Sequence, residues 1–367
     1  MAFELIKDSF NELPAFGLDF SDRSIKVMQL ARDGKRIKIL SSNRREIPAG
    51  LLVDGEVKDS DGLVKEIQET LRTAKPYPIT NKETILSLPE SKCFIKVIKM
   101  PKSNPEDIEE AIRFKAEEYF PLNAEEMYLD WRLLDTIECP IDEKGDCSDI
   151  LVAVASKNIV ESYLEVMDKS GLIPVVFEAE SVATTRALLR DEIYMTGSSL
   201  VIDLGNDRTS FIFYKYPTLK FTQSIPVSGE KFTLAIAKGL KISFQKAEKL
   251  KYEMGLSRDS QEGEKVYELL LPIMQDLVSN IAKSIDYYND YFRTSSKEDF
   301  KIVICGGGAN LRSMDSFLSK ILDKSVEIAN PWKEINANKI QGQGLSTRNR
   351  TLFYTTALGL ALYNLSD

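Results

Sequence analysis

The sequence contains no histidine among its 367 residues. That absence excludes Ser-His-Asp hydrolysis, Cys-His catalysis and most zinc sites, because all of them depend on an imidazole. The four cysteines are scattered and form no C-x-x-C pair, which favours reduced thiols in a cytoplasm over a disulfide framework. Any chemistry must therefore use carboxylates, hydroxyls, lysines and a bound cation.

Long apolar runs and an excess of positive charge are missing as well. No run of about 18 uninterrupted apolar residues occurs, so we expect no membrane-spanning helix. Residues 1–14 lack the basic-then-apolar order of a signal peptide. The formal net charge of -8 argues against broad nucleic-acid binding, which needs a basic surface. A length of 367 residues suits two or three lobes, each with its own core.

Two segments of the chain repeat one pattern. Phe16–Leu30 and Leu200–Tyr214 each read as an apolar strand carrying an aspartate, a short polar turn and a second apolar strand. The turns Ser21–Arg23 and Gly205–Asp207 suit hairpins whose backbone N–H groups point into one concavity. Two copies separated by about half the chain indicate an internally duplicated fold.

The remaining periodicity is typical of an α/β protein. Between the hairpins we expect a helix at Asp61–Lys75, strands within Glu83–Met100, a helix at Pro105–Phe120, strands at Tyr128–Leu134 and Ile150–Ala155, and a helix at Asn158–Lys169. This order predicts a small inserted α+β domain. Beyond the second hairpin we expect helices at Lys231–Leu240, Ser243–Tyr252 and Val266–Phe292, a strand at Phe300–Cys305, and helices at Leu311–Leu322 and Thr355–Tyr363.

Polar side chains around the two turns supply what a nucleotide phosphate chain needs. Phosphate oxygens need hydrogen-bond donors, and a divalent cation needs carboxylates that hold its waters. Asp19 and Asp203 lie where an α/β sheet places its ligands, and they are the candidate carboxylates for Mg²⁺, held through water. The donors and positive charges nearby are Ser21, Arg23, Ser24, Lys26, Asn206 and Thr209. One such hairpin alone favours a simple capped turn, whereas two matched copies favour a nucleotide site.

Three further features each have two interpretations. The turn Gly306–Gly308 lets a backbone approach a nucleobase or ribose, but it equally suits a plain strand-to-helix turn. Glu180 begins a helix and is a candidate to orient a hydrolytic water, although helix N-termini favour glutamate in any case. Glu248 and Lys251 lie one helical turn apart, and on spacing alone we favour an exposed ion pair.

The two hairpins, the insertion and the glycine turn together resemble the actin, sugar-kinase and heat-shock chaperone superfamily. Five segments are more specific: A-I-R-F-K-A-E-E-Y-F-P at Ala111–Pro121, Y-L-D-W at Tyr128–Trp131, Leu151–Leu189 with A-V-A-S-K and A-T-T-R-A-L-L, I-V-I-C-G-G-G-A-N-L at Ile302–Leu311, and V-E-I-A-N-P at Val326–Pro331. Through these segments the sequence resembles the PilM family of type IV pilus assembly proteins. The resemblance covers nearly the whole chain.

This resemblance implies a fold and a set of site residues. The fold is a duplicated, two-lobed actin-like (ribonuclease H-like) α/β fold. Its expected parts are a first lobe at 1–83, an inserted α+β domain at 84–172, a return to the first lobe at 173–197, and a second lobe at 198–367 with a helical subdomain at about 229–298. The first phosphate loop would contain Asp19, Ser21, Ser24 and Lys26, and the second would contain Asp203, Gly205, Asn206 and Thr209. The adenosine turn (302–311) would contain Gly306, Gly307 and Gly308, and the ribose and adenine edge would contain Glu248 and Lys251. Gly229 would also bind the nucleotide, although Ser228-Gly229 stands where relatives more often have two glycines. Glu180 falls on the helix that carries a catalytic group in related ATPases.

The resemblance also implies a function. Such proteins bind ATP or ADP with Mg²⁺, and Ser21 in place of a common glycine argues for weak or absent hydrolysis. They hold the N-terminal tail of a bitopic inner-membrane partner, PilN, in a groove between the core and the inserted domain, here lined by the helix Ile108–Phe120. They lie at the cytoplasmic face of the inner membrane, contact it indirectly, and communicate with pilus motor ATPases and platform proteins. Self-association stays open.

Two other classes remain as alternatives. A small-molecule kinase of the same superfamily would need an aspartate base facing a sugar pocket, and the sequence offers no convincing candidate. An FtsA-like polymerising membrane tether would carry a linker and an amphipathic targeting helix after the packing helix Thr355–Tyr363, and the sequence ends at Asp367. Both alternatives are therefore less favoured than the pilus scaffold.

Overall fold

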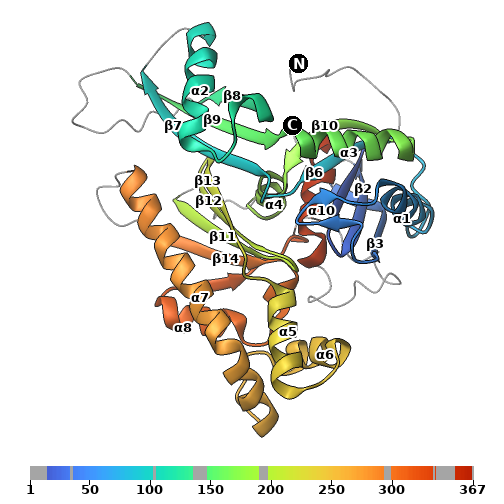
Figure 1. Cartoon of the computed structure of the whole chain (residues 1–367), viewed down its shortest axis with the longest axis vertical. Helices are drawn as coiled ribbons and strands as arrows, with labels where there is room; N and C mark the ends of the chain where they lie inside the picture. Colours follow the sequence, from blue (N-terminus) through green and yellow to red (C-terminus); the bar gives the residue numbers. More distant parts are fainter. Residues whose placement is uncertain are drawn as a thin grey trace.

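Two sheets with the same strand order organise the chain (Figure 1). The computed structural model describes residues 15–33, 36–101, 105–134, 147–189, 197–292, 299–333, 335 and 352–365. The first sheet has the order β10-β6-β1-β2-β3, built from β1 (Phe16–Ser21), β2 (Ser24–Asp33), β3 (Arg36–Glu46), β6 (Glu83–Leu88) and β10 (Ile173–Ala179). The second begins with the order β15-β14-β11-β12-β13, built from β11 (Ser198–Leu204), β12 (Thr209–Lys215), β13 (Thr218–Ile225), β14 (Phe300–Cys305) and β15 (Val326–Ile328).

The sense of pairing is the same in both sheets. In each sheet the first two strands along the chain form an antiparallel hairpin, which pairs Ser21 with Ser24 in one sheet and Leu204 with Thr209 in the other. A third antiparallel strand follows on one side, and two parallel strands lie on the other. The predicted duplication is thereby confirmed, because the two segments with the same sequence pattern form equivalent hairpins in two sheets of the same topology.

The insertion extends the second sheet. Its elements are β7 (Cys93–Pro101), α2 (Pro105–Tyr119), a 3₁₀ turn (Ala124–Glu126), β8 (Met127–Leu133) and β9 (Cys147–Ser156). β7 joins β13 through the single pair Phe221 and Lys96. Ile108 and Ile112 of α2 pack on Ile150 and Val152 of β9, a core separate from that of the lobes.

The structure places part of segment 84–172 with the first lobe. β6 lies inside that segment and pairs with β1 and β10 of the first sheet. Helix α3 (Lys157–Ser170) packs against α1 (Ser60–Arg72), which covers the first sheet near the small ribbon β4 (Leu52–Val53) and β5 (Glu56–Val57). The elements that leave the first lobe therefore run from β7 to β9. Sequence alone did not separate β6 from β7, because both are short apolar strands.

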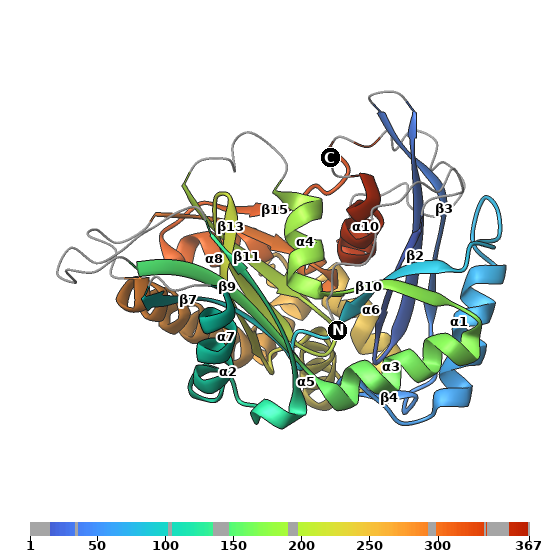
Figure 2. The same ribbon diagram turned by 90° about the horizontal axis from the view of Figure 1, so that it is seen from above.

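Two helices lie side by side where the lobes meet (Figure 2). They are α4 (Glu180–Leu188), which follows β10, and α10 (Thr355–Ala361), which follows a short 3₁₀ segment (Leu352–Tyr354). A Cβ built on Gly359 would come within 1.8 Å of the Ala183 carbonyl oxygen, so only glycine permits this approach. This packing of α4 on α10 fixes the position of Glu180, the first residue of α4, between the two lobes.

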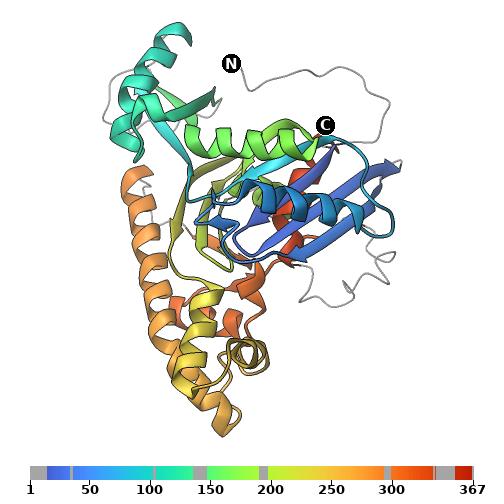
Figure 3. The ribbon, with the colours of Figure 1, turned by 45° about the vertical axis from the view of Figure 1, so that its right-hand side comes forward.

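Helices of the second lobe pack beside its sheet and extend beyond one end of it (Figure 3). They are α5 (Gly229–Leu240), α6 (Phe244–Glu253), α7 (Gln261–Phe292) and α8 (Met314–Leu322). Ser228 caps α5 by accepting a hydrogen bond from the Lys231 amide, and Pro272 lies within α7. A 3₁₀ turn (Gly307–Asn310) precedes α8, so this helix begins slightly later than expected. Within the described residues, no helix combines the length and the apolar character that crossing a bilayer would require.

Candidate functional site

Both hairpin turns line one cleft of about 560 Å³ between the lobes. Nearly all the residues that the sequence singled out share this cleft: Asp19, Ser21, Arg23, Ser24, Lys26, Glu180, Asp203, Gly205, Asn206, Gly229, Glu248, Lys251, Gly306, Gly307 and Gly308. They come from segments far apart in the chain. The duplicated topology brings them together, because it places equivalent strand ends face to face.

Thr209 is the exception, because the structure does not place its hydroxyl in the cleft. Its side chain is fully buried, and its hydroxyl donates to the Val227 carbonyl at 2.8 Å. The next residue, Ser210, lines the cleft and lies opposite Asp203 in the sheet. Because successive side chains of a strand point to opposite faces, a displacement of one residue separates a ligand position from a core position.

Asp19 is held in place by two hydrogen bonds. Lys26 Nζ donates to its Oδ2 at 2.7 Å, and Ser87 Oγ donates to its Oδ1 at 2.9 Å. Lys26 lies directly across the hairpin, and the Asp19 side chain is buried. Beside it, Ser24 is buried and its hydroxyl lies 3.3 Å from that of Ser21. The first hairpin therefore offers an oriented carboxylate, a cation and two hydroxyls.

Asp203 is half-buried, and among the described residues no lysine or arginine forms an ion pair with it. Burial and the nearby Asp19 carboxylate raise its pKa to about 6, although the Lys26 charge and the Cys305 thiol oppose the shift. Gly306 has φ 76°, and a Cβ there would lie 2.2 Å from Asp203 Oδ1. The glycine turn thus leaves the space that the carboxylate occupies.

Two glutamates complete the acidic part of the cleft. Glu180 Oε2 accepts from the Glu90 amide at 3.3 Å, and Glu90 Oε2 accepts from the Ser181 amide at 3.1 Å. Burial, followed by the charges of Asp19, Glu90 and Asp203, raises the pKa of Glu180 well above its ordinary range. Burial likewise raises the pKa of Glu90. The raised pKa favours the protonated form of Glu180, and its role in orienting a hydrolytic water stays a prediction.

These carboxylates fit a hydrated cation better than a directly bound one. Among the described residues, no three acidic or cysteine side chains converge as a ligand set. Asp19 and Asp203 nevertheless face one cleft, and their mutual repulsion contributes to the raised pKa of Asp203. Mg²⁺ commonly keeps several waters in protein sites, which carboxylates then hold. Asp19 and Asp203 are accordingly the residues suited to hold such a hydrated ion.

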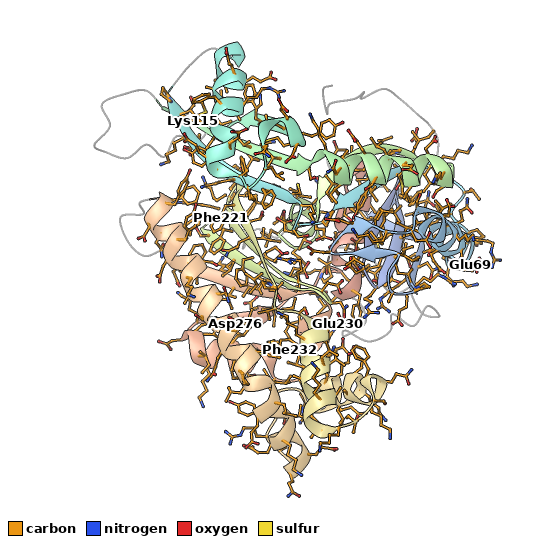
Figure 4. The ribbon with its side chains drawn as sticks, in the orientation of Figure 1. Glu69, Lys115, Phe221, Glu230, Phe232 and Asp276 are labelled. Atoms are coloured by element: carbon orange, nitrogen blue, oxygen red, sulfur yellow. The ribbon has the colours of Figure 1, made fainter. Side chains whose placement is uncertain are left out.

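Two ion pairs join the lobes across the cleft. Arg23 Nη2 of the first hairpin lies 2.5 Å from Glu230 Oε1, at the start of α5 (Figure 4). Arg208 Nη1 of the second hairpin lies 3.4 Å from Asp54 Oδ1. The Asp22 carboxylate accepts from the amides of residues 54 and 55, which fixes the position of that loop. Each hairpin therefore contacts the opposite lobe.

Lys251 is a buried cation, which corrects the expectation of an exposed pair. Its side chain is 2% exposed, and Nζ donates to Glu248 Oε2 at 2.7 Å, Thr233 Oγ1 at 2.9 Å and the Gly229 carbonyl at 3.1 Å. Burial lowers its pKa, against the opposing effect of Glu248. The pair lines the cleft beside the α5 N-terminus. Spacing correctly placed the two residues on one face but could not show that the face is covered.

Several lining residues were not anticipated. They are Asp22, Arg44, Asp54, Glu90, Asp207, Arg208, Ser210, Phe244, Tyr252 and Phe353. Asp22 and Asp207 lie in the two hairpin turns that the sequence pattern identified, so they could have been predicted from their positions in those turns. Arg44 and Phe353 had none, because only the tertiary fold brings β3 next to the segment before α10.

Comparisons with known proteins agree on the fold. The chain is similar to the solved PilM-PilN type IV pilus biogenesis complex, with a TM-score of 0.80 and 24% identity over 97% of this chain and 99% of that chain. It is also similar to MreB5 of Spiroplasma citri bound to AMPPNP, with a TM-score of 0.58 and 14% identity over 96% of both chains. These likenesses establish an actin-like fold.

Curated sequences and a family model give the family. Cell division protein FtsA of Staphylococcus epidermidis is 26% identical over 217 residues, which are 52% of this chain and 47% of that protein. FtsA of Bacillus subtilis is 25% identical over 192 residues, 48% and 43% of the two chains. The chain spans about half the length of these curated relatives. The model of type IV pilus assembly protein PilM matches residues 17–365, and the chain therefore belongs to the PilM family of type IV pilus assembly proteins.

Proposed function

We propose that the chain is an ATP-binding scaffold of a pilus assembly platform at the inner face of the cytoplasmic membrane. The observation that carries this proposal is that both hairpin turns, Ser21–Arg23 and Gly205–Asp207, line the same cleft with Asp19 and Asp203. Turn N–H groups and hydroxyls suit phosphate oxygens, and the two carboxylates suit a hydrated Mg²⁺. The MreB5 structure with AMPPNP supports a nucleotide ligand for a fold of this kind.

Nucleotide here acts as a structural ligand with slow or no turnover. Glu180 is the candidate catalytic carboxylate, and burial together with the neighbouring acidic charges raises its pKa, which favours the protonated form. The cleft also carries ion pairs from each hairpin to the opposite lobe. A ligand that contacts both hairpins at once would fix the lobes relative to one another, which is a task that needs binding rather than hydrolysis.

A substitution at Asp203 tests the nucleotide part. Asp203→Asn keeps the shape of the side chain and its acceptor for the Cys305 thiol but removes the charge. We expect Mg-ATP affinity, measured by calorimetry, to fall about tenfold or more, because a carboxylate contact to a hydrated cation is lost. Asp61→Asn, on the exposed surface of α1, is the matched control. Unchanged affinity in Asp203→Asn would remove this cleft as the nucleotide site.

The partner is a PilN-like bitopic membrane protein, held by its N-terminal tail. The similar solved complex contains PilN, and this supports a partner of that class. The predicted groove is lined by the helix Ile108–Phe120 and its neighbouring strands, but Ile108 and Ile112 are buried against the insertion's sheet. We therefore add Leu151 and Ala153 as candidate tail contacts, because they are half-buried and lie on the opposite face of that sheet, toward the core of the lobes. Val175 on the edge strand β10 is 37% exposed and adds an apolar position on the first lobe.

Membrane recruitment tests the partner assignment. Vesicles carrying the full-length PilN-like protein should float the chain in a density gradient, whereas vesicles without it should not. Val175→Glu should weaken recruitment, because a charge would enter an apolar contact. Ile321→Glu is the control, since Ile321 is 52% exposed on α8, outside the insertion. Recruitment that needs no partner would instead favour a direct membrane tether of the FtsA type.

A further inference from the structure

An arginine and a phenylalanine form a stack on the wall of the cleft. Arg44 of β3 places its guanidinium carbon 4.8 Å from the centroid of the Phe353 ring. Both residues line the cleft, and neither belongs to a hairpin turn or to the acidic group. A guanidinium over an aromatic face is a favourable arrangement, because the cation meets the negative face of the ring.

The glycine turn fixes the phenylalanine. A Cβ built on Gly307 would lie 2.5 Å from Phe353 Cε1, so the ring lies directly against the turn's backbone. The preceding glycine, Gly306, makes the equivalent close approach to Asp203. The same turn therefore contacts both the acidic group and the arginine–phenylalanine stack, and it sets the distance between them.

Arg44 has hydrogen-bonding capacity that the described residues leave unused. Its Nε is buried and has no hydrogen-bond partner among them, and its contact from Nη1 to Glu46 is long, at 3.4 Å. The next residue on the strand, Arg45, instead donates from Nε to Glu66 at 2.6 Å. The guanidinium of Arg44 is therefore held mainly by its contact with the Phe353 ring, whereas that of Arg45 is held by an ion pair.

The second lobe presents aromatic side chains to the same space. Tyr252 and Phe244 of α6 line the cleft, and Phe244 is 42% exposed. Arg44 of the first lobe and Tyr252 of the second line the same cleft, and the Arg44 charge opposes the rise in the pKa of Tyr252 that burial causes. A planar aromatic ligand would fit a site with aromatic rings on one lobe and a flat cation on the other.

We propose that Arg44, backed by Phe353, is the platform for the purine base of the bound nucleotide. The face of the guanidinium away from Phe353 stacks on the base. This inference rests on the proposed nucleotide function and adds a specificity-determining residue from the first lobe. Because Gly307 and Tyr252 belong to the second lobe, a base bound here joins the lobes at a point separate from the phosphates.

Two ligands separate the contribution of the base from that of the phosphates. Mg-ATP and magnesium tripolyphosphate, which lacks the base and ribose, are titrated by calorimetry into the full chain. Arg44→Ala should weaken ATP binding about tenfold while leaving tripolyphosphate binding unchanged. Arg44→Lys keeps the charge without the planar face, and its ATP affinity should fall between those of wild type and Arg44→Ala. Arg45→Ala is the matched control on the same strand and should change neither affinity.

The outcomes distinguish the possible failures. Equal losses for ATP and tripolyphosphate would overturn the platform, because Arg44 would then act on the phosphates through its charge. An unchanged ATP affinity in Arg44→Ala would overturn it as well and leave the nucleotide function intact. A wild-type chain that binds neither ligand would overturn both proposals together. Phe353→Leu provides a second variant should Arg44→Ala fail to fold, and it should weaken ATP binding selectively in the same way.

Discussion

Gly306 and Asp203 fit together so closely that a Cβ on the glycine would lie 2.2 Å from the aspartate Oδ1. The backbone of Gly306, at φ 76° and ψ 176°, is also one that other residues rarely adopt. The glycine turn and the acidic group therefore form one unit. A residue larger than glycine at this position disturbs both the strand end and the carboxylate.

Gly306→Ala should destabilise the protein by roughly 2 to 4 kcal/mol, because backbone strain and a steric clash add. Gly50→Ala isolates the strain, since Gly50 has φ 94° and nothing within 4 Å of a built Cβ. That control should cost only about 1 kcal/mol. Urea denaturation of both variants measures the difference. Equal losses would mean that the close approach to Asp203 has no energetic weight.

Gly359→Ala tests the contact between α4 and α10. A Cβ there would lie 1.8 Å from a backbone carbonyl, which cannot move aside alone, so we expect a loss of about 2 to 4 kcal/mol. Gly239→Ala is the contrast, because its added Cβ meets only the movable Leu269 side chain, and alanine favours a helix. The thermal midpoint of Gly359→Ala should fall well below that of Gly239→Ala. Similar midpoints would contradict the tight helix packing.

The ion pair between the buried Lys251 and the partly exposed Glu248 predicts a non-additive result. Glu248→Gln removes the carboxylate from a lysine that is 2% exposed and should cost about 1 to 3 kcal/mol. Adding Lys251→Met to that variant should recover part of the loss, because no unpaired charge then remains buried. A double-mutant cycle in urea measures the coupling. Strictly additive effects would show that Thr233 and the Gly229 carbonyl satisfy Lys251 without the glutamate.

The pKa of Asp203 predicts a pH dependence of stability. Because its pKa is about 6 in the folded chain against an ordinary 3.8, the folded state holds this proton more tightly than the unfolded state. This proton stabilises the folded state fully below pH 3.8, and the stabilisation, about 3 kcal/mol, is lost as the pH rises through 6. Asp203→Asn should lack this loss, so the variant should be more stable than wild type at pH 7. Equal stabilities of the two proteins from pH 4 to pH 7 would contradict a raised pKa.

The sequence predicted the parts of the site that depend on local chemistry. The turns after β1 and β11 were recognisable because their polar residues interrupt apolar strands, and the topology follows from their duplication. The sequence did not show that the Thr209 hydroxyl lies outside the cleft, because one step along a strand reverses the side-chain direction. Arg44 and Phe353 were not predicted, because strand pairing and helix packing bring them to the cleft. Neither residue lies in a local sequence pattern that indicates a binding site. The burial of Lys251 was hidden for the same reason.

Calorimetric titration of the chain with a peptide copying the N-terminal residues of the PilN-like protein, with and without saturating Mg-ATP, tests the central claim most directly. The scaffold account predicts saturable binding, tighter with Mg-ATP, because nucleotide that contacts both hairpins fixes the lobes beside the insertion. Asp203→Asn should still bind the peptide but lose the strengthening by nucleotide. A chain that binds Mg-ATP and no peptide, or that binds peptide equally with and without nucleotide, would contradict the account.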